Sequence, residues 1–173
     1  MNLLKRLSKL ERYEIVLPSI GRLHVYILCT KLDDEAQRAL REAENRKNSL
    51  VSLVPLFVAE KHSYEEMLTA LLEAYTLVYH GQSRARIRGL ETLRILCREK
   101  DLGKVARQCG ARPGEEVVVL IASPHSLDSI VTRLRLRECT IRIGANETSV
   151  TKTAVFPIDA RLFKIHSDIG ARD

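Results

Sequence analysis

Histidines and cysteines are the side chains of this 173-residue chain that could act as nucleophiles, bases or metal ligands. Five histidines occur, at positions 24, 62, 80, 125 and 166, and four cysteines, at positions 29, 97, 109 and 139. Their spacing contains neither an H-E-x-x-H motif nor a C-x-x-C pair, so a zinc site is not indicated. A G-x-S-x-G elbow and a glycine-rich phosphate loop are also missing from the sequence. We therefore predict no metal, no cofactor and no self-sufficient catalytic site.

The cysteines are expected to be buried free thiols, because Cys97 and Cys109 fall on apolar faces where a thiol usually fills the core. Disulfides are the alternative, in a cell whose cytosol tolerates them, as in some hyperthermophiles. A cysteine and a histidine could also meet in space without any local signature. An enzyme with a Cys or His nucleophile therefore stays open as an alternative function.

Basic residues form the second group with possible chemistry, and they lie on both sides of one predicted helix. The candidate nucleic-acid contacts are Lys61, His62, Arg84, Arg86 and Arg88. Lys61 and His62 precede a helix N-terminus, where free amides and a cation can receive an anion. The arginines lie at the start of a second predicted helix, where positive side chains interact unfavourably with the helix dipole. Contact with phosphate would explain their presence, because guanidinium groups bind phosphate oxygens well. The alternative is a solvated face on which the arginines pair with Glu91 or nearby acids.

The overall charge agrees with a polyanionic or acidic partner. Lys and Arg number 28 against 22 Asp and Glu, which gives a net charge of +6 and a pI of about 9.3. The lack of Trp and an aromatic content of 5% argue against a groove of stacked bases. No apolar run approaches the roughly 20 residues of a membrane span, and the N-terminus is too charged for a signal peptide. We expect a cytoplasmic protein that is not bound to a membrane.

The elements that must position these residues follow from local patterns. Two β-branched runs around a Pro18–Gly21 turn predict a hairpin over 13–29, and apolar runs predict strands at Leu50–Val58 and Glu116–Ala122. Helices are predicted at 35–47, 63–80, 84–97, 101–109, 126–137 and 148–165. The uninterrupted run Glu116–Ala122 is typical of a strand covered on both faces. The fold class is therefore α/β (α+β), a small mixed β-sheet packed against several α-helices in a single domain, 1–173.

Leu50 to Ala122 carries a family resemblance in the order of its parts. The stretch LVSLVPLFVAEKHSYEEMLTALLEAY contains an apolar strand and a long helix that is preceded by a Lys and a His. A helix with Glu91 and Leu93, then a short helix ending in glycine, appear as GQSRARIRGLETLRILCREKDLGKVARQCGA, followed by the strand EEVVVLIA. This arrangement resembles the small kinase-binding subunit of the KEOPS complex, the family of the PRPK-binding protein. That complex makes threonylcarbamoyladenosine on tRNA.

The resemblance implies a non-catalytic accessory subunit. Such subunits bind and regulate the kinase-like ATPase subunit of KEOPS, and archaeal ones bind tRNA near its 3′ end. The family ends in an apolar helix that docks on the kinase, whereas this chain has VTKTAVFPIDARLF, in which Pro157 would kink a helix. The residues expected to contact the kinase subunit are Val150, Ala154, Val155, Ile158 and Leu162. A stand-alone basic nucleic-acid-binding module is the alternative.

Overall fold

A computed structural model describes residues 3–7 and 9–143 of the chain. The strands are β1 (Leu3–Leu7), β2 (Glu11–Leu17), β3 (Gly21–Lys31), β4 (Leu50–Pro55), β5 (Glu116–Ser123) and β6 (Cys139–Ile143). The helices are α1 (Asp34–Glu44), α2 (Leu56–Ala59), α3 (Tyr64–Tyr79), α4 (Leu90–Cys97), α5 (Leu102–Cys109) and α6 (Asp128–Val131). The predicted helix over 148–165 lies outside the described residues.

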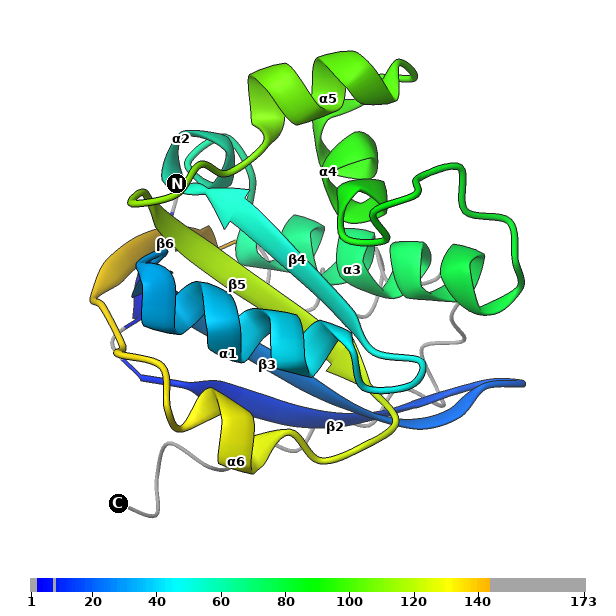
Figure 1. Cartoon of the computed structure of the whole chain (residues 1–173). Helices are drawn as coiled ribbons and strands as arrows, with labels where there is room; N and C mark the ends of the chain where they lie inside the picture. The colour runs from blue at the N-terminus through cyan, green and yellow to red at the C-terminus, as the bar shows by residue number, and fades with distance from the viewer. Residues whose placement is uncertain (1–2, 8, 144–173) are drawn as a thin grey trace.

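The strands form two sheets whose ladders are all antiparallel. The larger sheet has four strands in the order β2-β3-β5-β4, and the predicted hairpin supplies β2 and β3 (Figure 1). The smaller sheet pairs β1 with β6, so that Leu7 lies opposite Cys139. The predicted α/β class, with a sheet packed against helices, is confirmed.

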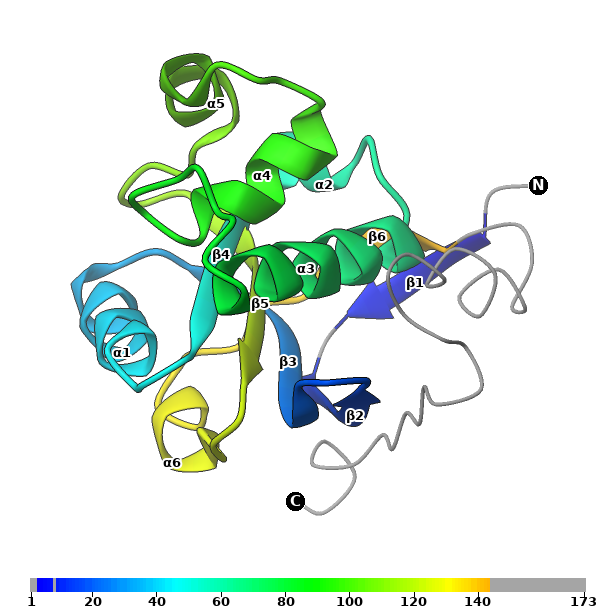
Figure 2. The same ribbon diagram turned by 90° about the vertical axis from the view of Figure 1, so that its right-hand side faces the viewer.

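Strand β5 is buried on both faces, as its apolar run predicts. Val118 and Leu120 pack into the core on the side of α3, together with residues of the smaller sheet. Val119 and Ile121 pack into a second core on the side of α1 and α6. Figure 2 shows this layering, with α1 and α6 on one side of the sheet and α3 and β1 on the other. Helices α4 and α5 lie beyond β4, at the edge of the sheet (Figure 1).

Three of the predicted helices begin at a side-chain cap. Asp33 accepts a hydrogen bond from the amide of Ala36 at 2.8 Å and so caps α1. Ser63 accepts from the amide of Glu66 at 3.1 Å at the start of α3, and Asp101 accepts from two amides at the start of α5. These short polar side chains satisfy amides that have no partner inside the helix, which fixes where each helix begins.

Two predicted helices are wrong in extent. The helix predicted over 84–97 begins only at Leu90, so residues 82–89 form a loop. The helix predicted over 126–137 is reduced to the four residues of α6. In addition, β6 forms where no strand is predicted, and it pairs with β1 from the other end of the described chain. Within the described part of the chain, no helix has both the length and the apolar composition needed to cross a membrane.

Candidate functional site

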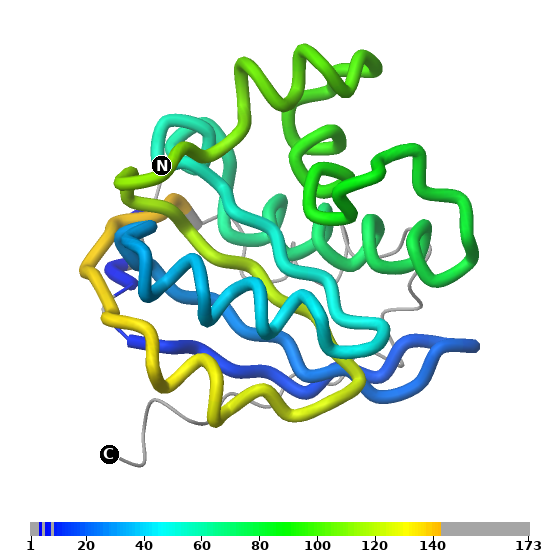
Figure 3. Tube along the Cα trace, in the orientation of Figure 1, coloured from blue at the N-terminus to red at the C-terminus, as the bar shows by residue number. Residues whose placement is uncertain are grey.

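Residues 82–89, which we call the arginine loop, connect the end of α3 to the start of α4 (Figure 3). Ala85 is buried, and the Ser83 hydroxyl accepts from its amide at 3.3 Å. A Cβ atom added to Gly89 would overlap the carbonyl oxygen of Val51 in β4, so the loop backbone lies directly against the sheet edge there. The loop therefore packs against the rest of the fold at Ala85 and Gly89.

The buried carboxylate of Glu91 holds the arginine loop at the first turn of α4. Its side chain is 0% exposed, and it accepts from the Ser83 hydroxyl at 3.1 Å. The guanidinium Nε of Arg94 donates to its other oxygen at 2.7 Å. Since Ser83 and Arg94 occupy the carboxylate, Glu91 is not the partner of the loop arginines.

The arginines of the loop differ in their surroundings. Arg84 and Arg86 are exposed and form no ion pair with any other described residue. Arg88 is half-buried and donates from its guanidinium to the backbone carbonyl of Glu44 at 3.2 Å. This hydrogen bond joins the loop to the last turn of α1. Two cations therefore point to solvent while a third ties their loop to a neighbouring helix.

An apolar groove of about 410 Å³ lies between α1, β4, α4 and α5, next to the arginine loop. Its polar lining is Gln37, Arg41 and Glu44, all on α1. The remaining lining residues are apolar: Leu32, Leu40, Val51, Leu53, Ile87, Gly89, Leu90, Leu93, Ala106, Gly110, Ala111 and Pro113. Ile87 comes from the arginine loop itself and is 61% exposed. The groove could hold an apolar or aromatic group whose charged end faces the arginines.

The end of α1 and the turn after it carry three further cations, of which Arg41 lines the groove. Arg41 lies in the last turn of α1, and Arg46 and Lys47 follow it, all with exposed side chains. Of these three residues, Arg46 alone forms an ion pair with another described residue, Glu42, at 4.0 Å. No local pattern groups these residues with the arginine loop, because the two segments meet only through the contact between Arg88 and Glu44.

Of the five predicted nucleic-acid contacts, Lys61 and His62 lie apart from the three arginines. They precede α3, whereas the arginine loop follows it, and 16 helical residues span about 24 Å. His62 is bound through Nδ1 to the Glu66 carboxylate at 2.8 Å. Both residues line a separate polar cleft of about 520 Å³, near Arg98 at the far end of α4. The residues predicted to contact the kinase subunit, at positions 150 to 162, lie outside the described part.

A polar cluster connects α6 to the hairpin on the opposite side of the sheet from α3. Arg12 donates to Asp128 at 3.1 Å and to Glu14 at 3.3 Å, and it lies 2.8 Å from Nδ1 of His24. Burial and the adjacent guanidinium of Arg12 lower the pKa of His24, which favours a neutral ring that accepts this hydrogen bond. Two carboxylates already neutralise Arg12, so the cluster is suited to joining elements and not to binding an anion.

Tyr26 belongs to the same cluster. Its hydroxyl donates to Asp128 at 2.6 Å and accepts from the amide of Leu127 at 2.8 Å. Burial, together with the hydrogen bond to Asp128, raises the pKa of Tyr26 to about 12. The ring therefore stays neutral and holds the start of α6 against β3.

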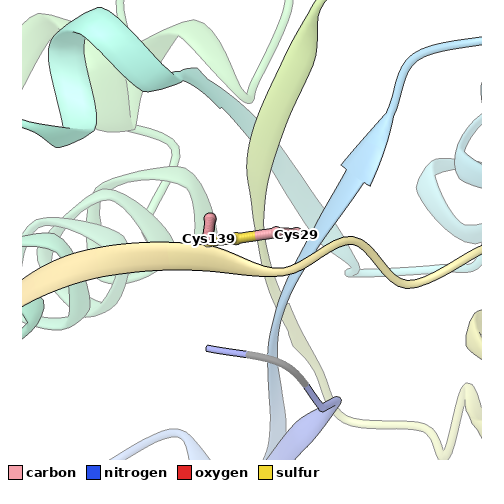
Figure 4. The surroundings of a disulfide bond; sticks show 2 residues. All are labelled: Cys29 and Cys139. Atoms are coloured by element: carbon pink, nitrogen blue, oxygen red, sulfur yellow. A yellow bond between two sulfur atoms is a disulfide. The ribbon is translucent and has the colours of Figure 1, made fainter. Parts of the chain in front are cut away.

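All four cysteines are paired, so the expectation of free thiols is wrong. Cys29 in β3 is bonded to Cys139 in β6, with a Cα–Cα distance of 6.3 Å (Figure 4). Cys97 and Cys109 connect the ends of α4 and α5, with a Cα–Cα distance of 7.0 Å. The first bond links the two sheets, and the second links two neighbouring helices.

The described residues contain no group of three or more His, Cys, Asp or Glu side chains arranged to hold a metal ion. No known protein family matches the sequence, and no curated protein matches it at a significant level of similarity.

Proposed function

We propose that the chain is a non-catalytic, tRNA-binding accessory subunit of the KEOPS complex that binds and regulates its kinase-like ATPase subunit. The family resemblance between Leu50 and Ala122 supports this assignment. The observation that carries the tRNA part of the proposal is the meeting of two basic segments. The arginine loop supplies Ile87 and Gly89 to the lining of one groove, α1 supplies Arg41 to it, and Arg88 joins the loop to the last residue of α1. The cations carried by these two segments are Arg41, Arg46, Lys47, Arg84, Arg86 and Arg88.

The chemistry of these groups fits the backbone of tRNA. Guanidinium groups bind phosphate oxygens through paired hydrogen bonds, and the exposed Arg84 and Arg86 have no competing acid among the described residues. Contacts to phosphate position a nucleic acid without selecting its sequence. Sequence-independent binding suits a subunit that serves many tRNAs. It also predicts a strong dependence of affinity on salt concentration.

Binding of labelled tRNA at several salt concentrations tests this part of the proposal. The double variant Arg84→Gln, Arg86→Gln should weaken binding and reduce the slope of log K against log salt by about two. The matched control, Arg135→Gln with Arg137→Gln, removes the same charge from exposed residues of the segment between α6 and β6. Figure 1 shows this segment on the opposite side of the molecule from the segment between α3 and α4. Equal effects of the two variants would show that the net charge, and not the arginine loop, determines binding.

Co-elution with the kinase-like ATPase subunit tests the partner. The two chains should elute together, and mixing them should change the rate of ATP hydrolysis. Replacing Val155 and Leu162 by Glu should abolish co-elution while the chain stays folded. Separate elution of the unmodified chain would refute the assignment to KEOPS, and tRNA binding retained under those conditions would favour a stand-alone nucleic-acid-binding module.

A further inference from the structure

The two disulfides hold parts of the fold that differ in burial. Cys29 and Cys139 are 3% and 9% exposed, and each lies within a strand of a sheet. Cys97 and Cys109 are only half-buried, and both are the last residues of short helices. A reductant in solution can therefore approach the second bond much more easily than the first.

The half-buried disulfide holds a helix that has few other attachments. Helix α5 has eight residues, of which only Val105 is buried. In Figure 1, α5 lies at the outer end of the molecule and α4 lies between it and α3. When the bond to Cys97 is broken, the end of α5 that carries Cys109 keeps the packing of Val105 and of the Cys109 side chain against the core. In contrast, the sheets hold Cys29 and Cys139 together after reduction, which favours re-formation of their bond.

The surroundings of Cys97 give a thiol access to its sulfur. Cys97 lines the polar cleft described above, together with Lys61 and Arg98. The cleft also contains Glu73 and Glu66, and Glu66 is bound to His62. Cations beside Cys97 stabilise its thiolate, which is released in the second step, when the mixed disulfide is resolved. The cleft therefore offers an approach to the Cys97 sulfur, and attack there expels Cys109 as the leaving thiolate.

Helix α5 also forms one wall of the apolar groove, through Ala106 and, just after the helix, Gly110 and Ala111. We propose that the Cys97–Cys109 disulfide is a reversible redox site whose reduction releases α5 and opens this wall of the groove. The reductant is a dithiol: one thiolate attacks a protein sulfur to form a mixed disulfide, and its second thiolate then closes a ring. Two electrons pass to the protein, Cys97 and Cys109 become thiols, and the dithiol becomes a cyclic disulfide.

Graded reduction of the unmodified chain with dithiothreitol tests the site. Thiols are trapped by alkylation and located by mass spectrometry, and hydrogen exchange is measured on the same samples. Half-reduction of Cys97 and Cys109 should need at least tenfold less dithiothreitol than that of Cys29 and Cys139. Exchange in Leu102–Cys109 should become at least tenfold faster, whereas exchange in β5 should stay unchanged.

Two variants separate the loss of the bond from other effects of the reductant. Cys97→Ser with Cys109→Ser should show the fast exchange in α5 without dithiothreitol and no further change with it. Cys29→Ala with Cys139→Ala should keep the response of α5 to dithiothreitol. Simultaneous reduction of both bonds in the unmodified chain, or unchanged exchange in α5 after Cys97 and Cys109 are alkylated, would overturn the proposal.

Discussion

Removal of the buried disulfide should cost the fold much of its stability. The bond between Cys29 and Cys139 closes a loop with a sequence separation of 110, whereas the bond between Cys97 and Cys109 spans 12. In the chain-entropy treatment, a bond over 110 residues destabilises the unfolded state by about 4.8 kcal/mol, and one over 12 residues by about 2.8 kcal/mol. For a chain of this length, the larger value corresponds to a fall in Tm of roughly 10–20 °C.

Urea denaturation followed by circular dichroism measures both values. The variant Cys29→Ala, Cys139→Ala is compared with Cys97→Ala, Cys109→Ala and with the unmodified chain, all without reductant. Loss of the long-range bond should lower the free energy of unfolding by about 2 kcal/mol more than loss of the short-range bond. It should also raise the m-value, because the unfolded chain becomes less compact. Equal losses, or a larger loss from the short-range bond, would refute the loop-entropy reasoning.

Three further perturbations follow from single contacts. Arg94→Met leaves the buried carboxylate of Glu91 without its cation and should lower the free energy of unfolding by about 3 kcal/mol, measured by urea denaturation. Gly89→Ala should cost about 2 kcal/mol, because its Cβ would overlap the carbonyl oxygen of Val51 and force the arginine loop away from β4. Tyr26 should stay protonated in the folded state up to about pH 12, while an unfolded tyrosine loses its proton near pH 10. The free energy of unfolding should therefore fall as the pH rises from 10 to 12, and Tyr26→Phe should reduce this fall.

Matched controls make these outcomes specific. Adding Glu91→Met to Arg94→Met removes both charges and should restore most of the lost stability; no recovery would mean that shape, and not the unpaired charge, determines the loss. Arg86→Ala changes an exposed side chain of the same loop and should leave stability within about 0.5 kcal/mol. A fall in stability between pH 10 and 12 that is identical with and without Tyr26→Phe would contradict the assigned shift.

The sequence predicts those elements whose cause is local. The caps at Asp33, Ser63 and Asp101 each bind an amide no more than three residues away. The uninterrupted apolar sequence of β5 by itself indicates a strand that is buried on both faces. Each of these signals depends on residues that are neighbours in the chain. The corresponding helices and strand therefore begin close to their predicted positions.

The errors occur where a distant contact overrides local preference. Residues 84–89 have helical composition, yet Gly89 must lie against Val51 and Ser83 must reach Glu91, and these contacts hold the segment as a loop. Strands β1 and β6 are short, and each finds its partner at the other end of the described chain. No window of neighbouring residues contains that information.

The candidate site was predictable only in part for the same reason. The arginines of the loop were identified from their residue type, but their grouping with α1 depends on the hydrogen bond from Arg88 to Glu44. Lys61 and His62 were grouped with them because one helix separates the two sets, although that helix holds them apart. The spacing of four cysteines likewise does not tell which pairs of Cβ atoms will meet.

The pairing of β1 with β6 has a consequence for the synthesis of the protein. A ribosome releases β1 first, but the partner of β1 and the sulfur that bonds Cys29 both arrive with the last described strand. Strand β3 likewise has no partner at its second edge until β5 is made, after five more helices and another strand. During most of its translation, the nascent chain therefore exposes an apolar hairpin in which the edge of β3 that will bind β5 has no partner. We expect folding to be completed after residue 143 emerges, and a chaperone that shields β3 until then should raise the yield of native protein.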